Sequence, residues 1–455
     1  MKRLILLTAL GWTVVALPLF AQTPAVEPAV AGPEISYSEP LAPPMPMNGV
    51  QLPVGFASEN VRSNILSAGI QLGSGYNDNA LVTPGDHVTN VSYLVVPNIQ
   101  MRRSRERWSL DLAYSPALMV NQQLSEQNQT AHNVSLVMNL ALSPHVNLRL
   151  RDNFAKTNNL FSGLSGNGIM PSPLQQSNTS LFVPLANSTN NNSGVDLTYR
   201  FGANSLVAAS GTFYFVNYGK VTGANGAYSL IDSRSAGGNA SYAHRFANRH
   251  WLGISYGFQQ LMFDPGRRAK VQRALAFYSL VITSQLSVSF WAGPQYSKST
   301  GTSVLVAGSG GILPYSGTTK WSPAGGMQFD WQGQRTGLRI GLLQQISDGG
   351  GLAEAVTLQQ ADIELHQQLS RRWTAVVGSA YAINRPLQRV LASPDFRSLQ
   401  GNAGLEFRIS DNLGLSLSYG RQQQTYSYSF LPQRVANQNR FWFNISYFFT
   451  RPLGR

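Results

Sequence analysis

One stretch of the sequence has the spacing of a serine-nucleophile motif. Gly253-Ile254-Ser255-Tyr256-Gly257 fits G-x-S-x-G, in which a sharp strand-to-helix turn presents the serine to the substrate. Around it, apolar and polar residues alternate from Leu252 to Gln259, which is the period of a strand that runs straight through the motif. Because the pattern lacks the turn that would expose the serine, we interpret the match as chance and predict no catalytic residue.

The residue types in the sequence do not indicate a metal site or a cofactor site. Cysteine is absent, which excludes structural disulfides, thiolate metal sites and a cysteine nucleophile. The sequence predicts no metal site, no cofactor and no enzyme. A hydrolase that uses serine and histidine set on the wall of the fold is kept as the third hypothesis for function. The histidines are dispersed, without metal-ligand spacing: His87, His132, His145, His244, His250 and His366.

The charges argue against nucleic acid as a partner. Charged residues are 12% of the chain, a low share for a soluble protein, and the formal net charge is +13. The basic residues are scattered, with neither a recognition module nor a basic-aromatic cluster. Many arginines stand beside short turns, as Arg102, Arg245 and Arg371 do. We interpret these as solvated residues at a lipid headgroup boundary.

Short amphipathic segments fill the chain from about Ser67 to Thr450. In Leu413–Gly420, Leu413, Leu415, Leu417 and Tyr419 alternate with Gly and Ser, so the apolar side chains share one face of a strand. Tight connections recur at 103–107, 143–145, 202–205, 247–250, 283–285, 332–336, 370–372 and 410–413. Longer polar connections fall at 78–89, 120–131, 158–192, 219–234, 264–272, 299–318, 348–355, 385–397 and 429–438.

Eight short and nine long connections join eighteen strands. The pattern predicts an all-β fold, a transmembrane antiparallel up-and-down β-barrel of about 18 strands, with 16 as the alternative. An even number puts both termini in the periplasm, with short turns there and long loops outside. No apolar run of spanning length follows residue 21, so any insertion into the membrane is by strands. The expected location is the bacterial outer membrane, with its lipid as a partner.

Alternation also predicts which charges face the barrel interior. Arginine or lysine on the lipid side costs roughly 2–4 kcal/mol at the bilayer midplane, and an aqueous lumen removes that cost. These side chains either line a pore with a transverse field or form salt-bridged struts across the interior. Asp152 breaks the pattern, because alternation from Leu148 and Leu150 points it outward, so either a bulge intervenes or the register is misread there. The predicted pore-lining residues are Asp111, Arg149, Arg151, Asp196, Arg200, Asp330, Arg339, Asp362, Glu364, Glu406 and Arg408.

The N-terminal 60 residues have a different composition from the rest. Met1-Lys2-Arg3 is basic, an apolar run follows to Phe20, and Ala21 offers a small-residue cleavage site, so residues 1–21 are predicted to be a signal peptide. Residues 22–60 contain eight prolines from Pro24 to Pro53 and are predicted to be a disordered periplasmic linker. The barrel is assigned to residues 61–455.

Aromatic residues mark the predicted membrane boundaries and the last strand. Trp108, Phe201, Phe246, Trp251, Trp331 and Trp373 stand beside short turns and are predicted to form the periplasmic girdle. The segment 441–449 resembles the C-terminal signature strand of outer-membrane proteins, which implies recognition by the barrel-assembly machinery. Six further residues follow it here, whereas that signature usually ends the chain. One face of the strand carries Phe441, Phe443, Ile445, Tyr447 and Phe449.

The first predicted strand resembles a known family. Gly69-Ile70-Gln71-Leu72-Gly73-Ser74-Gly75-Tyr76-Asn77-Asp78-Asn79 is similar to the opening of the β-barrel porin 2 family, whose first strand ends in a Gly-Tyr-polar-Asp-Asn turn. The hairpin that follows, with its arginine-rich turn, also fits. The resemblance covers the barrel by architecture and a short motif by sequence. It implies an outer-membrane barrel, and it implies association with polysaccharide export components.

The long segment 158–192 is the third predicted external loop. It contains no charged residue, and we expect it either to fold inward and narrow the pore or to plug the mouth. The leading hypothesis for function is a porin-like channel that passes solutes, with saccharides or exported polysaccharide as candidates. The alternative is a non-conducting structural or assembly barrel that acts with a partner.

Overall fold

The computed structural model describes residues 64–83, 85, 87–158, 187–219, 230–264, 266–301, 304–305, 312–313, 317–351, 354–387, 395–427 and 434–453. The predicted signal peptide at 1–21 and linker at 22–60 lie outside the described residues, and both stay predictions. The chain divides into two units, residues Met1–Ala42 and Pro43–Arg455. Everything below concerns the second unit.

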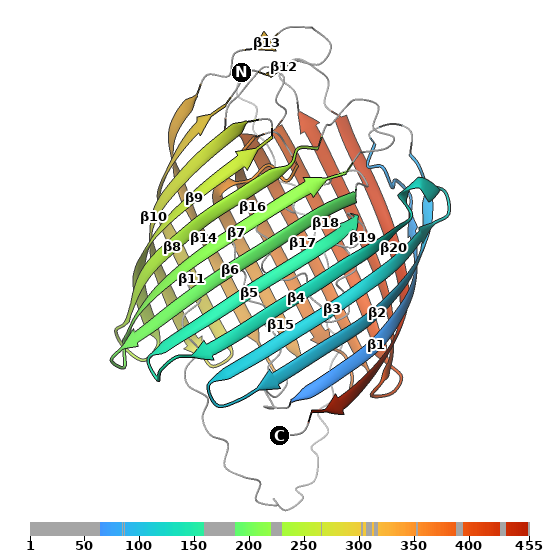
Figure 1. Cartoon of the computed structure of the whole chain (residues 1–455), viewed down its shortest axis with the longest axis horizontal. Coiled ribbons are helices and arrows are strands. Elements are labelled where there is room, and N and C mark those ends of the chain that lie inside the picture. The colour runs from blue at the N-terminus through green and yellow to red at the C-terminus, as the bar shows by residue number, and fades with distance from the viewer. Residues whose placement is uncertain are drawn as a thin grey trace, which may run out of the picture. The chain divides into compact units, whose positions relative to one another are not determined.

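Eighteen strands form one sheet that closes on itself (Figure 1). Each strand pairs antiparallel with its neighbours in the sequence, and the first strand pairs with the last. Strands β12 (Val304–Leu305) and β13 (Ile312–Leu313) form a separate two-stranded ribbon, and η1 (Ser125–Gln127) is a 3-10 turn. The barrel strands are β1 (Ile65–Asn77), β2 (Asn90–Ser104), β3 (Trp108–Asn121), β4 (Gln129–Ala141), β5 (Val146–Asn158), β6 (Asn187–Phe201), β7 (Ser205–Tyr218), β8 (Ser233–Arg245), β9 (His250–Phe263), β10 (Arg267–Thr283), β11 (Leu286–Thr300), β14 (Thr318–Gln332), β15 (Thr336–Ser347), β16 (Val356–Gln368), β17 (Trp373–Pro386), β18 (Asp395–Arg408), β19 (Leu413–Ser427) and β20 (Arg434–Pro452).

The predicted closed antiparallel barrel of 18 strands is confirmed, and the alternative of 16 strands is wrong. The ladder from Ile65↔Pro452 to Asn77↔Arg440 seals β1 against β20. All eight predicted tight turns join consecutive strands. Among the described residues, no helix is long and apolar enough to cross a bilayer.

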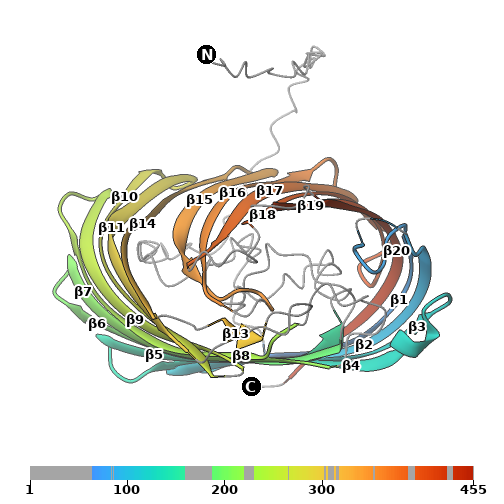
Figure 2. The same cartoon turned by 90° about the horizontal axis from the view of Figure 1, so that it is seen from above.

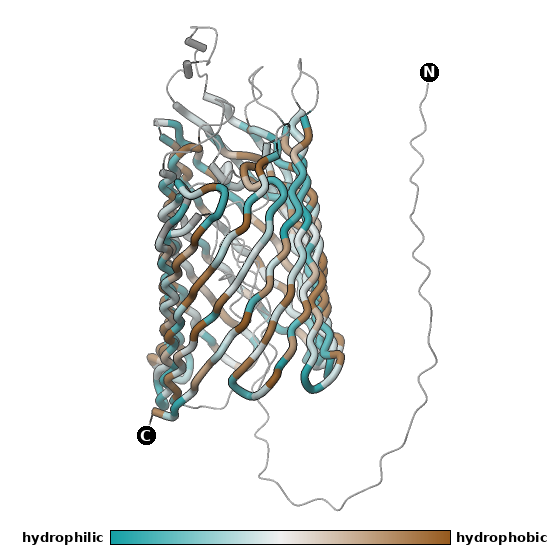
Figure 3. The backbone as a smooth tube through the Cα atoms, turned by 90° about the vertical axis from the view of Figure 1, so that its right-hand side faces the viewer, coloured by the Kyte–Doolittle hydropathy of each residue, from teal (hydrophilic) through white to brown (hydrophobic). Residues whose placement is uncertain are grey.

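Alternation along the strands gives the barrel two chemically different faces, visible as alternating apolar and polar residues in Figure 3. On β9, Leu252, Ile254 and Tyr256 are exposed, Ile254 to 64%, whereas Gly253 and Ser255 between them are buried. The exposed apolar face is the outer one, because the closed sheet turns its other, polar face inward. A closed barrel with an apolar exterior is the structure of a bacterial outer-membrane protein, and the outer membrane is where this protein resides.

The bounds of one predicted connection and the place of one predicted girdle residue are wrong. The connection between β9 and β10 is only the three residues 264–266, not 264–272, because β10 begins at Arg267. Trp251 does not belong to the outer girdle. It is buried on the interior face with Leu206, Ala243 and Phe277. It faces inward because it lies two residues before the inward-facing Gly253 on the same strand. Of the other five predicted girdle residues, Phe246 lies in a turn and the rest occupy outward-facing strand positions. Phe201, Phe246, Trp331 and Trp373 are exposed.

The predicted assembly strand is β20. Its residues Phe441, Phe443, Ile445, Tyr447 and Phe449 are all exposed on the outer face, while Trp442 between them is buried inside. The strand continues to Pro452 and pairs with both β19 and β1, which explains why residues follow the aromatic signature. Recognition of this strand by the assembly machinery stays a prediction.

Candidate pore lining and constriction

All eleven predicted pore-lining residues occupy positions that face the barrel interior on their strands. Register pairs such as Arg149↔Asp196, Asp330↔Arg339 and Arg339↔Glu364 place neighbours on the same face of the sheet. Most of the eleven lie in the half of each strand that ends at a short turn, which is the half predicted to face the periplasm. The structure brings them together in separate groups. The first, on β2 and β3, is Arg102 with Asp111, joined by an ion pair of 3.1 Å at the barrel rim.

The group on β5 and β6 is centred on a buried ion pair. Arg151 Nη2 donates to Asp196 Oδ1 at 3.0 Å, and Arg151 Nε lies 2.9 Å from Asp196 Oδ2. The two side chains are only 3% and 11% exposed. Gly194, opposite Arg151 in the ladder, makes this possible, because a Cβ there would lie 2.9 Å from the guanidinium. Arg149 and Arg200 flank the pair on the same face, so this wall has three arginines and one aspartate.

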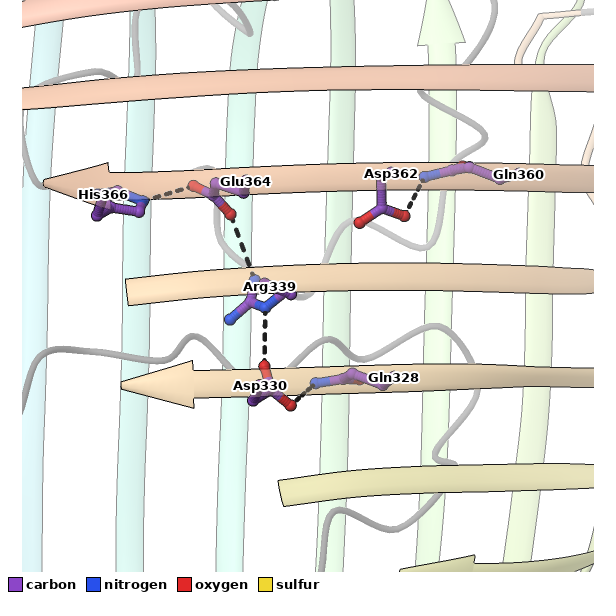
Figure 4. A network of polar contacts seen from close by, with 7 residues as sticks. All are labelled: Gln328, Asp330, Arg339, Gln360, Asp362, Glu364 and His366. Carbon is purple, nitrogen blue, oxygen red and sulfur yellow. Dashed lines mark hydrogen bonds and ion pairs between the residues drawn. The ribbon is translucent and has the colours of Figure 1, made fainter. Parts of the chain in front are cut away.

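The group on β14, β15 and β16 is a longer network (Figure 4). Arg339 Nε donates to Asp330 Oδ1 at 3.3 Å, and Arg339 Nη1 lies 3.6 Å from Glu364 Oε2. Glu364 Oε1 lies 2.8 Å from Nε2 of His366. The sequence reasoning left His366 out of the pore-lining set, although alternation alone places a residue two positions from Glu364 on the same face.

Two amides and two further carboxylates extend this acidic wall. Gln328 Nε2 donates to Asp330 Oδ2 at 2.7 Å, and Gln360 Nε2 donates to Asp362 Oδ1 at 3.2 Å. On β18, Glu406 lies opposite Thr374 of β17 in the ladder. No ion pair within the described residues involves Glu406 or Arg408. From β14 to β18, the half that ends at the short turns therefore has four carboxylates and two arginines: Asp330, Asp362, Glu364 and Glu406 with Arg339 and Arg408.

The basic and acidic walls face each other across the bore. Strands β5 and β16 are nine strand-to-strand steps apart in either direction around the sheet, and they lie on opposite sides of the barrel seen from above (Figure 2). An excess of positive charge on one wall thus opposes an excess of negative charge on the other. Opposite net charges on facing walls set up a transverse field across the bore.

Asp152 does point outward, so both expectations for it, a bulge in the strand or a misread register, are wrong. It lies opposite Leu136 and Ser193 in unbroken ladders. Ser193 Oγ donates to Asp152 Oδ1 at 2.6 Å, and Asn191 Nδ2 donates at 3.2 Å. The carboxylate is satisfied by these two neighbours on β6, and this pairing lowers the cost of facing outward.

The outer half of the bore is narrowed by an infolded hairpin. The β14–β15 ladder stops at Gly325↔Gln344, although β14 stays paired with β11 up to Thr318. Beyond Gln344, the end of β15 turns inward with β16 (Figure 2). Ile346, 1% exposed, packs against Leu261, Phe263, Ala269 and Val271 on the interior faces of β9 and β10.

The segment at the tip of the hairpin reaches other parts of the barrel. Ile231 N donates to Gly351 O at 3.0 Å, and Leu387 N donates to Ala355 O at 3.1 Å. Gly350 and Gly351 have φ angles of 57° and 100°, a conformation that favours glycine. The connection between β15 and β16 is therefore bonded to the end of the β7–β8 loop and to the end of β17.

Arg273 on β10 anchors this hairpin. Its guanidinium donates from Nη1 to Gln345 Oε1 and from Nη2 to Gln259 Oε1, both at 2.9 Å. Gln295 Oε1 accepts from Ile346 N at 3.2 Å. Arg273 is 6% exposed and is held by amides. Sequence reasoning missed it, because the 264–272 loop assignment hid the alternation that places residues 269, 271 and 273 inside.

Of the predicted inward-folding loop 158–192, only the ends are described. Asn158 ends β5, and residues 187–192 belong to β6, so that part of the loop assignment is wrong. Residues 159–186 lie outside the described residues, and their role in narrowing the pore stays a prediction. Within the described residues, the interior is narrowed by the β15–β16 hairpin. No group of three or more metal-binding side chains occurs there.

Comparison with known proteins gives likenesses of fold. No protein-family model matches the chain, and no curated protein matches it. The crystal structure of Pseudomonas aeruginosa OccK2 (OpdF) in complex with glucuronate is 11% identical, with a TM-score of 0.42, over 85% of this chain and 98% of that chain. The outer membrane protein opdK from Pseudomonas aeruginosa is 11% identical, with a TM-score of 0.41, over 85% and 99%. Acinetobacter baumannii OccAB3 is 11% identical, with a TM-score of 0.39, over 85% and 99%.

Proposed function

We propose that this barrel is a channel for polar solutes, with the β15–β16 hairpin as its constriction. The observation that carries the proposal is the pair of oppositely charged walls on the interior face, nine strands apart. Barrels of 16–18 strands leave an aqueous channel, and charges on opposite walls are best stabilised by water between them. A field across the bore orients a dipolar solute without favouring either ion strongly.

The outer half of the bore suggests the solute class. Its interior side chains are mainly amides and hydroxyls, which donate and accept hydrogen bonds without selecting a charge. Such a surface fits saccharides and other polyhydroxylated solutes. Passage of an exported polysaccharide is a narrower form of this proposal, and it rests on the family resemblance at residues 69–79. These amides and hydroxyls are buried at 7% exposure or less, so a solute reaches them only where the bore opens; they include Asn77, Asn90, Asn121, Asn153, Asn190, Gln295, Ser297, Asn384, Gln424 and Gln438.

A structural, non-conducting barrel is the second candidate. The buried Arg151–Asp196 pair and the anchored hairpin both fill interior space. If the hairpin closes the bore completely, the charged walls are struts and the protein serves a partner. A conductance measurement separates the two functions.

The experiment compares Arg273→Met with Gln272→Met in planar bilayers. Arg273→Met removes the hydrogen bond to Gln345 of the hairpin and the one to Gln259 of β9, whereas Gln272 lies on the outer face of the same strand and serves as the matched control. We expect discrete conductance from the wild type, permeation of small sugars into liposomes, and a larger conductance for Arg273→Met only. Correctly folded wild-type protein that never conducts, with Arg273→Met equally silent, would overturn the channel in favour of the structural barrel.

A further inference from the structure

Four basic side chains gather on the outer face of the barrel near one end. Arg234 on β8, Arg268 and Lys270 on β10 and Lys298 on β11 are all exposed. They lie at the end of these strands opposite the short turns, since β8 begins at Ser233, β10 begins at Arg267 and β11 ends at Thr300. This end carries the outer loops, so the basic patch lies at the level of the outer leaflet.

The register places the four in two adjacent rows. Arg234 and Arg268 both pair with Met262 of β9, one from each side. In the next row, Lys270 lies directly opposite Lys298. We call these four residues the outer basic patch.

The outer basic patch has the parity of the lipid-facing residues. Along β9, Met262 shares its face with Tyr256 and Ile254, which are 53% and 64% exposed. Along β11, Lys298 shares its face with Tyr296, whose ring lies 5.2 Å from that of Trp321. An exposed apolar surface with an aromatic girdle therefore continues from the patch toward the membrane centre.

Two acids lie beside the patch, Asp232 just before β8 and the exposed Asp264 just after β9, so its four positive charges are balanced only in part. None of the described outer-face residues of β8 to β11 is acidic, and none of the four basic residues is in an ion pair with a described residue. The connecting segments 219–231 and 299–318 contain no acidic residue in the sequence either. Like charges directly opposite each other in a sheet destabilise it, so the Lys270–Lys298 pair favours binding of an anion.

We propose that the outer basic patch binds the phosphate groups of a phosphorylated lipid of the outer leaflet, whose acyl chains lie on the apolar surface beside it. Lysine and arginine near a membrane surface attract anionic headgroups. A free phosphate would gain nothing from the exposed apolar surface around Tyr256, whereas a lipid uses both parts. The inference rests on the outer-membrane location and is independent of whether the barrel conducts.

The test measures lipid binding by the full-length protein in neutral detergent. The variant is Lys270→Gln with Lys298→Gln, and the control is Arg421→Gln, an exposed arginine on the outer face of β19 that pairs with Gly401 and Asn439. The probes are a diphosphorylated glucosamine-based lipid, its dephosphorylated form and inorganic phosphate. We expect the double variant to bind the diphosphorylated lipid about tenfold or more weakly, and the control to bind it like the wild type.

A stability measurement distinguishes a binding role from a structural one. Without lipid, the double variant should unfold at a higher temperature than the wild type, because the repulsion between the lysines is gone. With the phosphorylated lipid, the order should reverse, since the lipid stabilises the protein that binds it more tightly. Equal binding of the dephosphorylated lipid, equal binding by the double variant, or competition by millimolar inorganic phosphate would each overturn the proposal.

Discussion

Two strand boundaries of this barrel are built in opposite ways. At the chain closure, β1 and β20 are paired through 13 consecutive residues, from Ile65↔Pro452 to Asn77↔Arg440. At the β14–β15 boundary, inside the chain, only eight pairs form, from Gly325↔Gln344 to Gln332↔Gly337. The join that has no covalent connection is complete, whereas the join between strands linked by a short turn is open in its outer half.

The difference follows from how each boundary satisfies its backbone groups. An unpaired strand edge in a membrane is costly, because no water is available to bond it. At the closure, only the ladder hydrogen bonds between β1 and β20 satisfy the backbone groups of the two strand edges. At β14–β15, side-chain amides substitute for the ladder in part: Gln344 Nε2 donates to Pro323 O at 3.1 Å, and Ile346 N donates to Gln295 Oε1. A barrel can thus fold part of its wall inward where glutamines are available.

The open boundary leaves a cleft in the wall of about 310 Å³. Outward-facing Leu342, Gln344 and Tyr381 line it together with Gly325, where the ladder ends. The interior-facing Gly326 and Leu343 also contribute, so the cleft reaches into the wall. We therefore expect different consequences from mutations at the closure and from mutations at the β14–β15 boundary.

The largest effect is expected at the closure. A chain that lacks residues 441–455 loses most of β20 and leaves β1 and β19 with unpaired edges. We expect no heat-modifiable band on detergent gels and no protein in the outer membrane. The control is a chain that ends at Leu453, which keeps the whole ladder and should assemble normally. Assembly of the chain lacking residues 441–455 would show that the closure is not needed.

Alternation in the sequence was enough to predict the closure but not the open boundary. The parity of Phe441 to Phe449 depends only on a side-chain period of two, and so does that of the eleven interior charges. Parity says which face a residue occupies, but it does not say whether the neighbouring strand stays alongside. The infolding of β15 depends on contacts between residues about 70 positions apart, such as Arg273 and Gln345. The misplaced 264–272 loop then hid Arg273 itself.

The second prediction uses the absence of cysteine from the chain to map the β14–β15 boundary. Phe329 and Ile340 are register partners on the outer face, so cysteines at both positions should form a disulfide readily. Continuing the same register would place Pro323 opposite Ile346, but Ile346 is packed inside. Cysteines at 323 and 346 should therefore not cross-link, as judged by gel migration after mild oxidation. Efficient cross-linking at 323 and 346 would mean that the boundary is closed.

The third prediction compares ion pairs at a complete and at an incomplete boundary. Arg151→Gln leaves Asp196 buried without its partner, and breaking a buried pair costs roughly 3–5 kcal/mol of unfolding free energy. Arg102→Gln at the exposed pair with Asp111 should cost about 1 kcal/mol or less. Arg339→Gln should fall between them, because Glu364 is 30% exposed. Urea unfolding in detergent gives the three values.

Arg339→Gln should also act on the open boundary itself. Arg339 holds Asp330 across β14 and β15, below the point where the ladder ends. Its removal should speed hydrogen exchange at residues 325–328 relative to the wild type, whereas Arg151→Gln should leave those amides unchanged, because β5 and β6 pair through their whole length. Equal exchange in both variants would show that the ion pair does not support the shortened ladder.

The smallest effect is expected in ion selectivity, where the two walls themselves are compared. Replacing Arg149 and Arg200 by Gln removes positive charge from the wall at β5 and β6, so the reversal potential in a salt gradient should shift toward cations. Replacing Asp362 and Glu406 by Asn and Gln should shift it toward anions by a similar amount. Combining all four changes should return it near the wild-type value, since the walls lose equal and opposite charge. The shifts are modest because mobile ions screen charges over about 8 Å at physiological ionic strength. If only one wall responds, the other is packed away from the water path and its charges act as struts.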